Sequence, residues 1–268
     1  MQAISRPLLL LAAGLLSTPA LAQGAETVDT PICTDRPTKA NAVCTVPKGG
    51  WQIETSAFGW TRFDTQGTRT DSWSLGASVF KVGLGDRSDL QVGVVPFLDV
   101  RTREPGGNRH VSGIGDVTLR VKYRLTAPGS TIQLAVIPFV KLPLAKTGLG
   151  NRKVEGGLAV PISLAAGSAT LTVGPELDVL ANADGDGRHM ALANLVNLAV
   201  PVAPTLTLIG ELWTATNFDP AGNVTQASAD AAIAFAATNR LQLDLGANLG
   251  LNRHTADLEA YTGISLRF

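Results

Sequence analysis

The sequence predicts an all-β protein that forms a transmembrane, antiparallel, up-and-down β-barrel of about twelve strands. Three observations lead to this prediction: hydrophobicity alternates with a period of two, short and long connections alternate along the chain, and the last strand ends on Phe268. Only 16% of the 268 residues are charged, against roughly 25% in ordinary soluble domains. Lys and Arg together number 22, as do Asp and Glu. This balance argues against a nucleic-acid partner, which requires a basic face.

The alternation is clearest in residues 117–125, whose sequence is VTLRVKYRL. The odd-numbered positions are apolar or aromatic, whereas Arg120, Lys122 and Arg124 share the other face, as in a strand and not in a helix. No stretch after residue 22 approaches the run of about 18 apolar residues that a helical membrane span needs. The pattern predicts strands at Trp51–Arg62, Asp71–Gly83, Asp89–Arg101, Gly115–Leu125, Thr131–Leu142, Lys153–Leu164, Ala169–Ala181, His189–Val200, Thr205–Thr216, Thr225–Ala236, Leu241–Leu251 and Asp257–Phe268.

The predicted connections alternate in length. Short, turn-forming connections are expected at Gly85–Ser88, Ala127–Ser130, Ala165–Ser168, Val202–Pro204 and Thr238–Arg240. Longer loops are expected at Phe63–Thr70, Thr102–Ser112, Pro143–Asn151, Asn182–Arg188 and Asn217–Val224, with a shorter one near Asn252–Thr255. Outer-membrane barrels have short periplasmic turns and longer extracellular loops, so this order favours a membrane barrel over a soluble, secreted β-protein. Pro138 and Pro175 fall inside predicted strands, where each removes a ladder donor.

Residues 1–22 are predicted to be a signal peptide. Arg6 supplies the positive charge, Leu8–Leu16 is the apolar core, and Ala22 ends a small-x-small cleavage pattern. The apolar core is too short for a membrane span, which needs about 20 residues. We therefore expect cleavage after Ala22 and export to the bacterial outer membrane. The next residue is Gln23 and not Cys, so no lipid anchor is expected there.

Residues 23–50 are predicted to form an irregular segment ahead of the barrel, which occupies residues 51–268. Export leads to an oxidising compartment, so Cys33 and Cys44 are predicted to form a disulfide and not a zinc site. Three prolines between residues 31 and 47 disfavour a helix. We expect the segment either to plug the barrel or to cover its periplasmic end, and we expect no metal or other cofactor.

The last strand carries a predicted assembly signal. Ile264, Leu266 and Phe268 share one parity, and the terminal aromatic residue is similar to the signal with which bacterial outer-membrane barrels end. The expected partners are therefore the barrel-assembly machinery and outer-membrane lipid.

Several motifs resemble those of a known family. They are Thr34-Asp-Arg-Pro37, Thr45-Val-Pro-Lys-Gly-Gly-Trp-Gln-Ile-Glu54, Gly113-Ile-Gly-Asp-Val117 and Lys122-Tyr-Arg124. Together they resemble landmarks of the outer-membrane transporter family named for the meta-pathway of phenol degradation, over nearly all of the mature chain. The resemblance implies an outer-membrane barrel, suggests aromatic compounds as solutes, and implies no catalytic residue.

If the apolar parity faces lipid, the other parity faces the lumen, where Arg120, Lys122 and Arg124 form a basic stripe. The other lumen-lining candidates are Glu54, Phe97, Glu176, Asp178, Glu211, Asp230, Asp244 and Glu259. These charges form either an ion-pair network that fills the lumen or a constriction whose field orients solutes. Eight strands enclose a filled interior and 16 to 18 a water channel, so about twelve predict a narrow pore.

The sequence favours a passive outer-membrane channel for small molecules, with aromatic or hydrophobic solutes among the candidates. A closed barrel with a structural role is the alternative interpretation. An outer-membrane hydrolase is a third, because His110, His189 and His254 fall in or beside the long loops. No Gly-x-Ser-x-Gly elbow or triad-like spacing supports it, so no enzymatic activity is expected.

Overall fold

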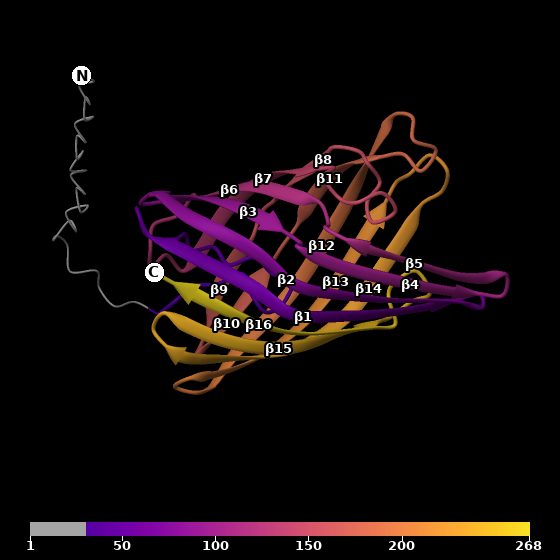
Figure 1. The fold of residues 1–268 in the computed structure, drawn as a ribbon. Coiled ribbons are helices and arrows are strands. Elements are labelled where there is room, and N and C mark those ends of the chain that lie inside the picture. The colour runs from indigo at the N-terminus through magenta and orange to yellow at the C-terminus, as the bar shows by residue number, and fades with distance from the viewer. Residues whose placement is uncertain (1–30) are drawn as a thin grey trace, which may run out of the picture. The chain divides into compact units, whose positions relative to one another are not determined.

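The computed structural model describes Pro31–Phe268, and the predicted signal peptide lies outside these residues. No helix in this part of the chain is long and apolar enough to cross a membrane. Its regular structure is a single sheet of sixteen strand elements (Figure 1). They are β1 (Trp51–Thr65), β2 (Thr68–Gly85), β3 (Ser88–Val94), β4 (Phe97–Glu104), β5 (Gly107–Gly113), β6 (Val117–Arg124), β7 (Ile132–Leu142), β8 (Glu155–Ala159), β9 (Ile162–Ala166), β10 (Ala169–Val173), β11 (Glu176–Ala181), β12 (Arg188–Ala203), β13 (Leu206–Asn217), β14 (Val224–Thr238), β15 (Leu241–Gly250) and β16 (Leu258–Arg267).

The sixteen elements form twelve antiparallel barrel strands, which confirms the predicted fold class. Four strands are each divided by a short interruption, so that β3 with β4, β5 with β6, β8 with β9, and β10 with β11 each form one strand. For example, β3 and β4 both pair with β2. The sheet closes because β1 pairs with β2 on one side and with β16 on the other. Closure removes the open sheet edge that hydrocarbon does not tolerate.

Two connections that were expected as long loops are strand hairpins. In Phe63–Thr70, β1 and β2 remain paired up to a turn formed by Gln66 and Gly67. Both turn residues have positive φ, 48° and 80°, as a type I′ hairpin turn requires. In Thr102–Ser112, β4 and β5 remain paired in the same way. The expectation of loops was wrong because polar residues with a period of two continue the strands beyond the apolar band. Both hairpins project past the rest of the wall (Figure 1).

Burial in the barrel is the reverse of that in a soluble domain. Among the buried side chains are charged ones: Lys122 and Asp89 are each 1% exposed. Large apolar side chains are exposed instead, and Leu245 and Leu249 each expose 56% of their surface. An apolar outer surface around a polar interior is the arrangement that a lipid bilayer requires.

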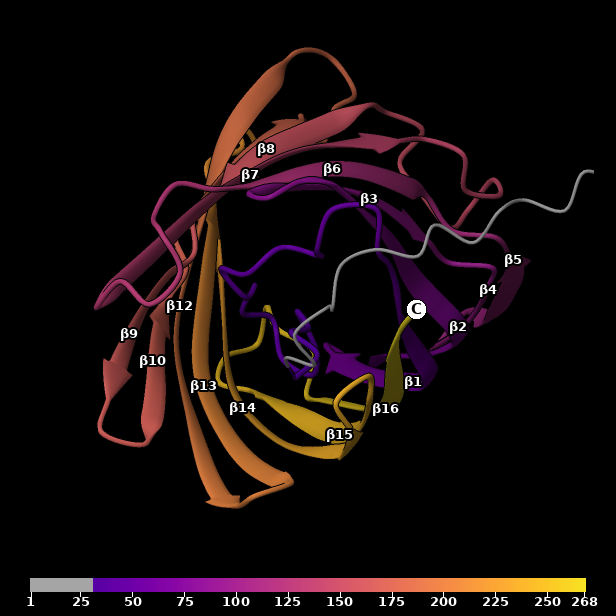
Figure 2. The ribbon, with the colours of Figure 1, turned by 90° about the vertical axis from the view of Figure 1, so that its left-hand side faces the viewer.

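The wall is least regular across β8–β11. Val160 and Pro161 separate β8 from β9, and Gly174 and Pro175 separate β10 from β11. Proline cannot donate to the ladder, and the two interruptions are neighbours, since the Val160 N–H donates to the Pro175 carbonyl at 2.9 Å. β7 pairs with β8 on one side of the interruption and with β9 on the other. The β9–β10 hairpin diverges from the ring (Figure 2), whereas Pro138 stays paired within β7.

A charge on the outer face should destabilise the barrel. Leu245 lies midway along β15 and is exposed on the outer face. We expect Leu245→Arg to lower the free energy of unfolding by about 2–4 kcal/mol, because the guanidinium would lie in hydrocarbon. The measurement is urea-induced unfolding of the barrel in lipid vesicles. Ala127→Arg adds the same charge in an exposed connection and should change the value by less than about 0.5 kcal/mol. Equal losses in the two variants would contradict the lipid-facing assignment.

Candidate functional site

The barrel encloses the irregular stretch Pro31–Gly50, called here the inner segment, which runs inside the ring of strands (Figure 2). Cys33 and Cys44 form a disulfide with their Cα atoms 6.4 Å apart, which confirms the predicted pairing. The disulfide closes the part of the segment that contains the Thr-Asp-Arg-Pro motif. The charged residues of that motif make the contacts that define the candidate site.

Asp35 lies at the centre of a buried ion cluster. Its carboxylate accepts hydrogen bonds from Lys81 Nζ on β2 and Lys122 Nζ on β6, each at 2.6 Å. Lys81 also pairs with Glu54 on β1 at 2.5 Å, and the Asp35 backbone N–H donates to the same Glu54 carboxylate at 3.1 Å. Burial alone would raise the pKa of Asp35, but the positive charges of Lys122, Lys81 and Arg120 outweigh it and hold this pKa well below its usual range. Two lysines and two carboxylates thus neutralise one another in a buried position.

Arg36 joins the inner segment to the opposite end of the chain. Its guanidinium donates two hydrogen bonds to Asp244 on β15, at 2.7 and 3.1 Å, in the bidentate geometry that favours arginine. It also lies over the Tyr261 ring, 5.8 Å from the ring centre. The close approach requires glycine at Gly263, because a Cβ atom there would collide with the guanidinium.

Lys39 and its neighbours bind a third group of wall residues. Lys39 Nζ pairs with Asp230 on β14 at 2.6 Å and lies 5.3 Å from the centre of the Trp213 ring. The backbone N–H groups of Lys39 and Ala40 each donate to a different oxygen of Glu211, at 3.0 Å. Backbone donors that a strand ladder would satisfy are therefore satisfied here by wall carboxylates.

The structure brings six of the predicted lumen residues into contact with the inner segment, and these six are Glu54, Arg120, Lys122, Glu211, Asp230 and Asp244. Arg120 reaches the segment through the Asn41 side chain. Four others have different surroundings. Arg124 donates to the Asp86 carbonyl at 2.9 Å, at the end of the barrel that carries the short turns (the short-turn end). Glu259 accepts from Asn248 at 2.7 Å. Glu176 lines interior cavities, and Asp178 faces Gly157 on β8.

The inward position expected for Phe97 is wrong. Its neighbour Leu98 lines an interior cavity, so Phe97 lies on the outer face, where it is 40% exposed. Strict alternation from Asp89 and Gln91, which are buried inside, would place Phe97 inward. The interruption at Val95 and Pro96 shifts the parity by one residue, which exchanges the two faces beyond it.

Several residues that hold the inner segment were missed at the sequence level. Lys81 bridges Asp35 and Glu54, Asp89 accepts from the Val46 N–H at 2.9 Å, and Asn197 bonds both Thr38 and Glu211 at 2.9 Å. The alternation along the strands could have identified them, because each is a polar residue on the lumen-facing side of a predicted strand.

Several cavities adjoin the inner segment, and Arg36 and Thr38 line three of them. The largest, about 520 Å³, lies between the disulfide loop and residues of β9, β10 and β12. The other two have volumes of about 330 and 320 Å³ and include Tyr261 and Phe139, respectively, in their linings. The inner segment thus divides the interior space into compartments.

The closed barrel and its charged interior define an outer-membrane type of β-barrel. The fold is similar to that of the COG4313 outer membrane channel from Pseudomonas putida F1, at 14% identity and a TM-score of 0.67, with 87% of this chain and 99% of that chain covered. It is also similar to the translocator domain of the autotransporter NalP from Neisseria meningitidis, at 13% identity and a TM-score of 0.52, with 82% and 89% covered.

The family described as "Putative MetA-pathway of phenol degradation" matches residues 34–268. The chain belongs to this family, as its motifs indicate. The match begins at Thr34, so it includes most of the inner segment as well as the whole barrel. A comparison with curated protein sequences found no match.

Removal of Arg36 should loosen the inner segment. In Arg36→Met the carboxylate of Asp244, whose side chain is fully buried, loses its partner, and we expect the free energy of opening the segment to fall by about 3 kcal/mol. The measurement is amide hydrogen exchange at Asp35, Lys39 and Ala40, whose N–H groups bond wall carboxylates.

The matched control is Arg36→Met combined with Asp244→Asn, which removes both charges. This double variant should recover part of the lost protection, because no buried charge is left unpaired, but not all of it, because the contact between the segment and the wall is still missing. Equal loss in the single and double variants would show that the loss does not come from the unpaired charge of Asp244.

Proposed function

We propose that this protein is a passive outer-membrane channel for small molecules and that the inner segment sets the width of its lumen. The observation that carries the proposal is the division of the interior into cavities by a segment whose anchors at Arg36 and Lys39 are side-chain contacts to the wall. Side-chain contacts can open without breaking the wall ladder, whereas a strand of the wall cannot move without exposing backbone groups to lipid. Residues Glu54, Arg120, Lys122, Glu211, Asp230 and Asp244 are, on this proposal, the anchors of a plug, and Arg124, Glu176, Asp178 and Glu259 line the space around it.

Small aromatic molecules are the solutes that we favour. The two smaller cavities, at about 330 and 320 Å³, include the aromatic residues Tyr261 and Phe139 in their linings. A cavity of about 150 Å³ is enough to hold benzene, so each of the two is large enough for a single ring. The family description, which names phenol degradation, supports the same class.

A channel accounts for the structure better than a hydrolase does. His110 is held by Asp99 at 2.5 Å, and Asp99 lies on the outer face, as Phe97 does, away from the interior cavities. His189 contacts Asn182 at 2.9 Å and Asp219 at 3.4 Å near the long loops. Neither arrangement places a histidine base at the interior site.

Export and assembly belong to the same proposal. We infer that the chain reaches the bacterial outer membrane by its signal peptide and is inserted by the barrel-assembly machinery through β16. Ile264, Leu266 and Phe268 carry that signal, and they lie beside the seam, where the Phe268 N–H donates to the Trp51 carbonyl at 2.8 Å.

Single-channel recording in planar bilayers tests the proposal. We expect the wild-type protein to give small, discrete conductance steps. A variant with Arg36→Met, Asp244→Asn, Lys39→Met and Asp230→Asn removes two anchoring pairs without leaving a partner unpaired, and its mean conductance should rise several-fold.

The control for charge loss is Glu104→Gln with Arg109→Gln, which removes an exposed pair at 3.5 Å on the β4–β5 hairpin. This control should keep the wild-type conductance. If neither the wild type nor the four-residue variant conducts, while both are folded by their gel mobility without heating, the barrel is a closed structural one. Stronger current block by benzoate than by acetate at equal concentration would support aromatic solutes.

A further inference from the structure

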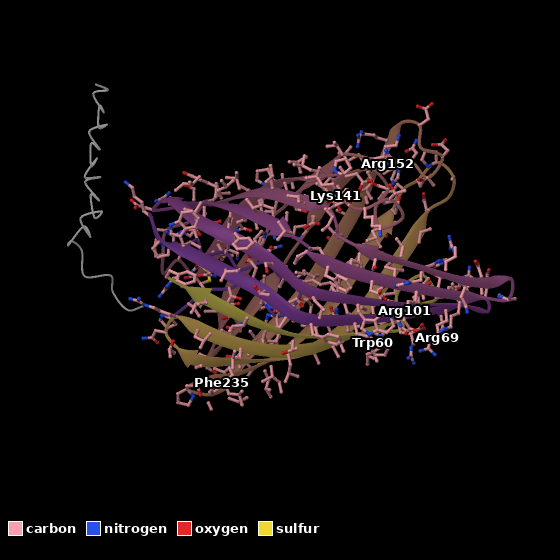
Figure 3. All side chains as sticks on the ribbon, in the orientation of Figure 1. Trp60, Arg69, Arg101, Lys141, Arg152 and Phe235 are labelled. Carbon is pink, nitrogen blue, oxygen red and sulfur yellow. A yellow bond between two sulfur atoms is a disulfide. The ribbon has the colours of Figure 1, made fainter. Side chains whose placement is uncertain are left out.

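The outer face of the projecting sheet carries four arginines, Arg62 on β1, Arg69 on β2, and Arg101 and Arg103 on β4, called here the outer arginine cluster. The face is assigned from their neighbours in sequence. Thr61, Ser72 and Leu98 line an interior cavity together with Tyr261. The residues that alternate with them therefore point outward, and paired residues of adjacent strands share that face. Figure 3 shows Trp60, Arg69 and Arg101 close together toward the projecting hairpins.

The paired rows of this face change in polarity from the barrel wall toward the hairpin tips. The first row, nearest the barrel wall, is Phe58, Leu75 and Phe97, all exposed and apolar, and the second is Trp60, Trp73 and Asp99. The third row is Arg62, Asp71, Arg101 and His110. The fourth row, nearest the tips, is Asp64, Arg69, Arg103 and Asn108. Successive rows are about 7 Å apart along the strands. Apolar residues followed by tryptophans mark the boundary between hydrocarbon and headgroups, so the arginines lie at headgroup depth.

The guanidinium groups are held in place and still present donors outward. Asp71 accepts from Arg69 at 2.8 Å and from Arg62 and Arg103 at 3.3 Å. The Asp71 side chain is 3% exposed, whereas those of Arg101 and Arg103 are 53% and 54% exposed. The carboxylates of Asp71 and Asp99 therefore lie beneath the arginines. Each guanidinium has five N–H donors, and the contacts to these two carboxylates engage one or two of them.

Stacking on the tryptophans fixes two of the arginines further. The Arg62 guanidinium lies 4.8 Å from the centre of the Trp60 ring, and that of Arg101 lies 5.0 Å from the centre of the Trp73 ring. Such contacts restrict the side chains before any ligand binds, which reduces the entropy cost of binding. Arginine in a fixed position is the residue that favours bidentate recognition of phosphate.

We propose that the outer arginine cluster binds the phosphate groups of a phosphorylated lipid headgroup in the leaflet that faces the long-loop end of the barrel. The proposal rests on the placement of the barrel in an outer membrane and is independent of solute passage. The ligand is a membrane lipid and not a soluble anion, because the cluster adjoins the lipid-facing apolar rows and lies outside the lumen. Its acyl chains would contact the first row while its phosphates reach the third and fourth rows.

The test measures binding of diphosphorylated lipid A to the purified barrel in detergent micelles, from the lipid phosphate retained per barrel after size-exclusion chromatography. The variant is Arg101→Gln with Arg103→Gln, which leaves Asp99 paired with His110 and Asp71 paired with Arg62 and Arg69. A headgroup contact contributes roughly fivefold in affinity per arginine, so we expect the Kd to rise on the order of twentyfold. The matched control, Arg87→Gln with Arg240→Gln, removes two exposed charges at the short-turn end and should keep the wild-type Kd.

Three results would overturn the proposal: an unchanged Kd in the cluster variant, an equal rise in the control variant, or equal binding of dephosphorylated lipid A. Displacement of lipid A by inorganic phosphate at equal concentration would also overturn it, because the cluster would then be a site for a soluble anion. Both variants should keep the wild-type single-channel conductance, so failure of this proposal leaves the proposed channel function unaffected.

Discussion

The pairing of β1 with β16 is the constraint on which the rest of the structure depends. Ten residues of each strand pair across this seam, from Gln52 with Arg267 to Arg62 with Leu258, with one register shift between Ser56 and Phe58. Without the seam, two strands would present unpaired backbone N–H and C=O groups to hydrocarbon, where each costs several kcal/mol. Closure in turn creates an interior that lipid cannot reach. Polar and charged side chains can then occupy one parity of every strand, provided that they find partners inside.

Those partners come largely from the inner segment. Asp35, Arg36 and Lys39 each meet wall residues of opposite charge, and backbone N–H groups of the segment meet the carboxylates of Glu54, Glu211 and Asp89. The equal numbers of acidic and basic residues in the chain have a structural counterpart in this pairing. A buried charge without a partner is costly, so the segment and the wall constrain each other's sequences. The charged residues of the Thr-Asp-Arg-Pro motif thus contact several strands at once.

Much of this could be predicted from the sequence, because alternation and connection length are local signals. The twelve strands and the polar interior follow from them, and the disulfide follows from the predicted export of the chain to an oxidising compartment. The prediction failed for Phe97, because the interruption at Val95 and Pro96 moves this residue to the outer face. Pro96 marks an irregularity, but the residue type does not reveal whether the alternation shifts by one position. The sequence predicts loops where the structure has the projecting hairpins with turns at Gln66–Gly67 and Pro105–Gly106. Outside the membrane both faces of a strand are polar, so the alternation of apolar and polar residues that marks a strand is absent. The partners of Arg36 could not be predicted, since Asp244 is 208 residues away.

This sequence separation has a consequence for the order of assembly. Asp35 can meet Glu54 and Lys81 as soon as β1 and β2 exist, whereas Arg36 and Lys39 find Asp244 and Asp230 only when β14 and β15 are in place. The inner segment therefore has early contacts at one edge of the growing sheet and late contacts near the other edge. Because those two edges become neighbours when the seam closes, the segment can act as an internal template that holds the first and last strands near each other. The inner segment precedes all the strands in the chain, so it is available to contact both the first and the last of them before the barrel closes.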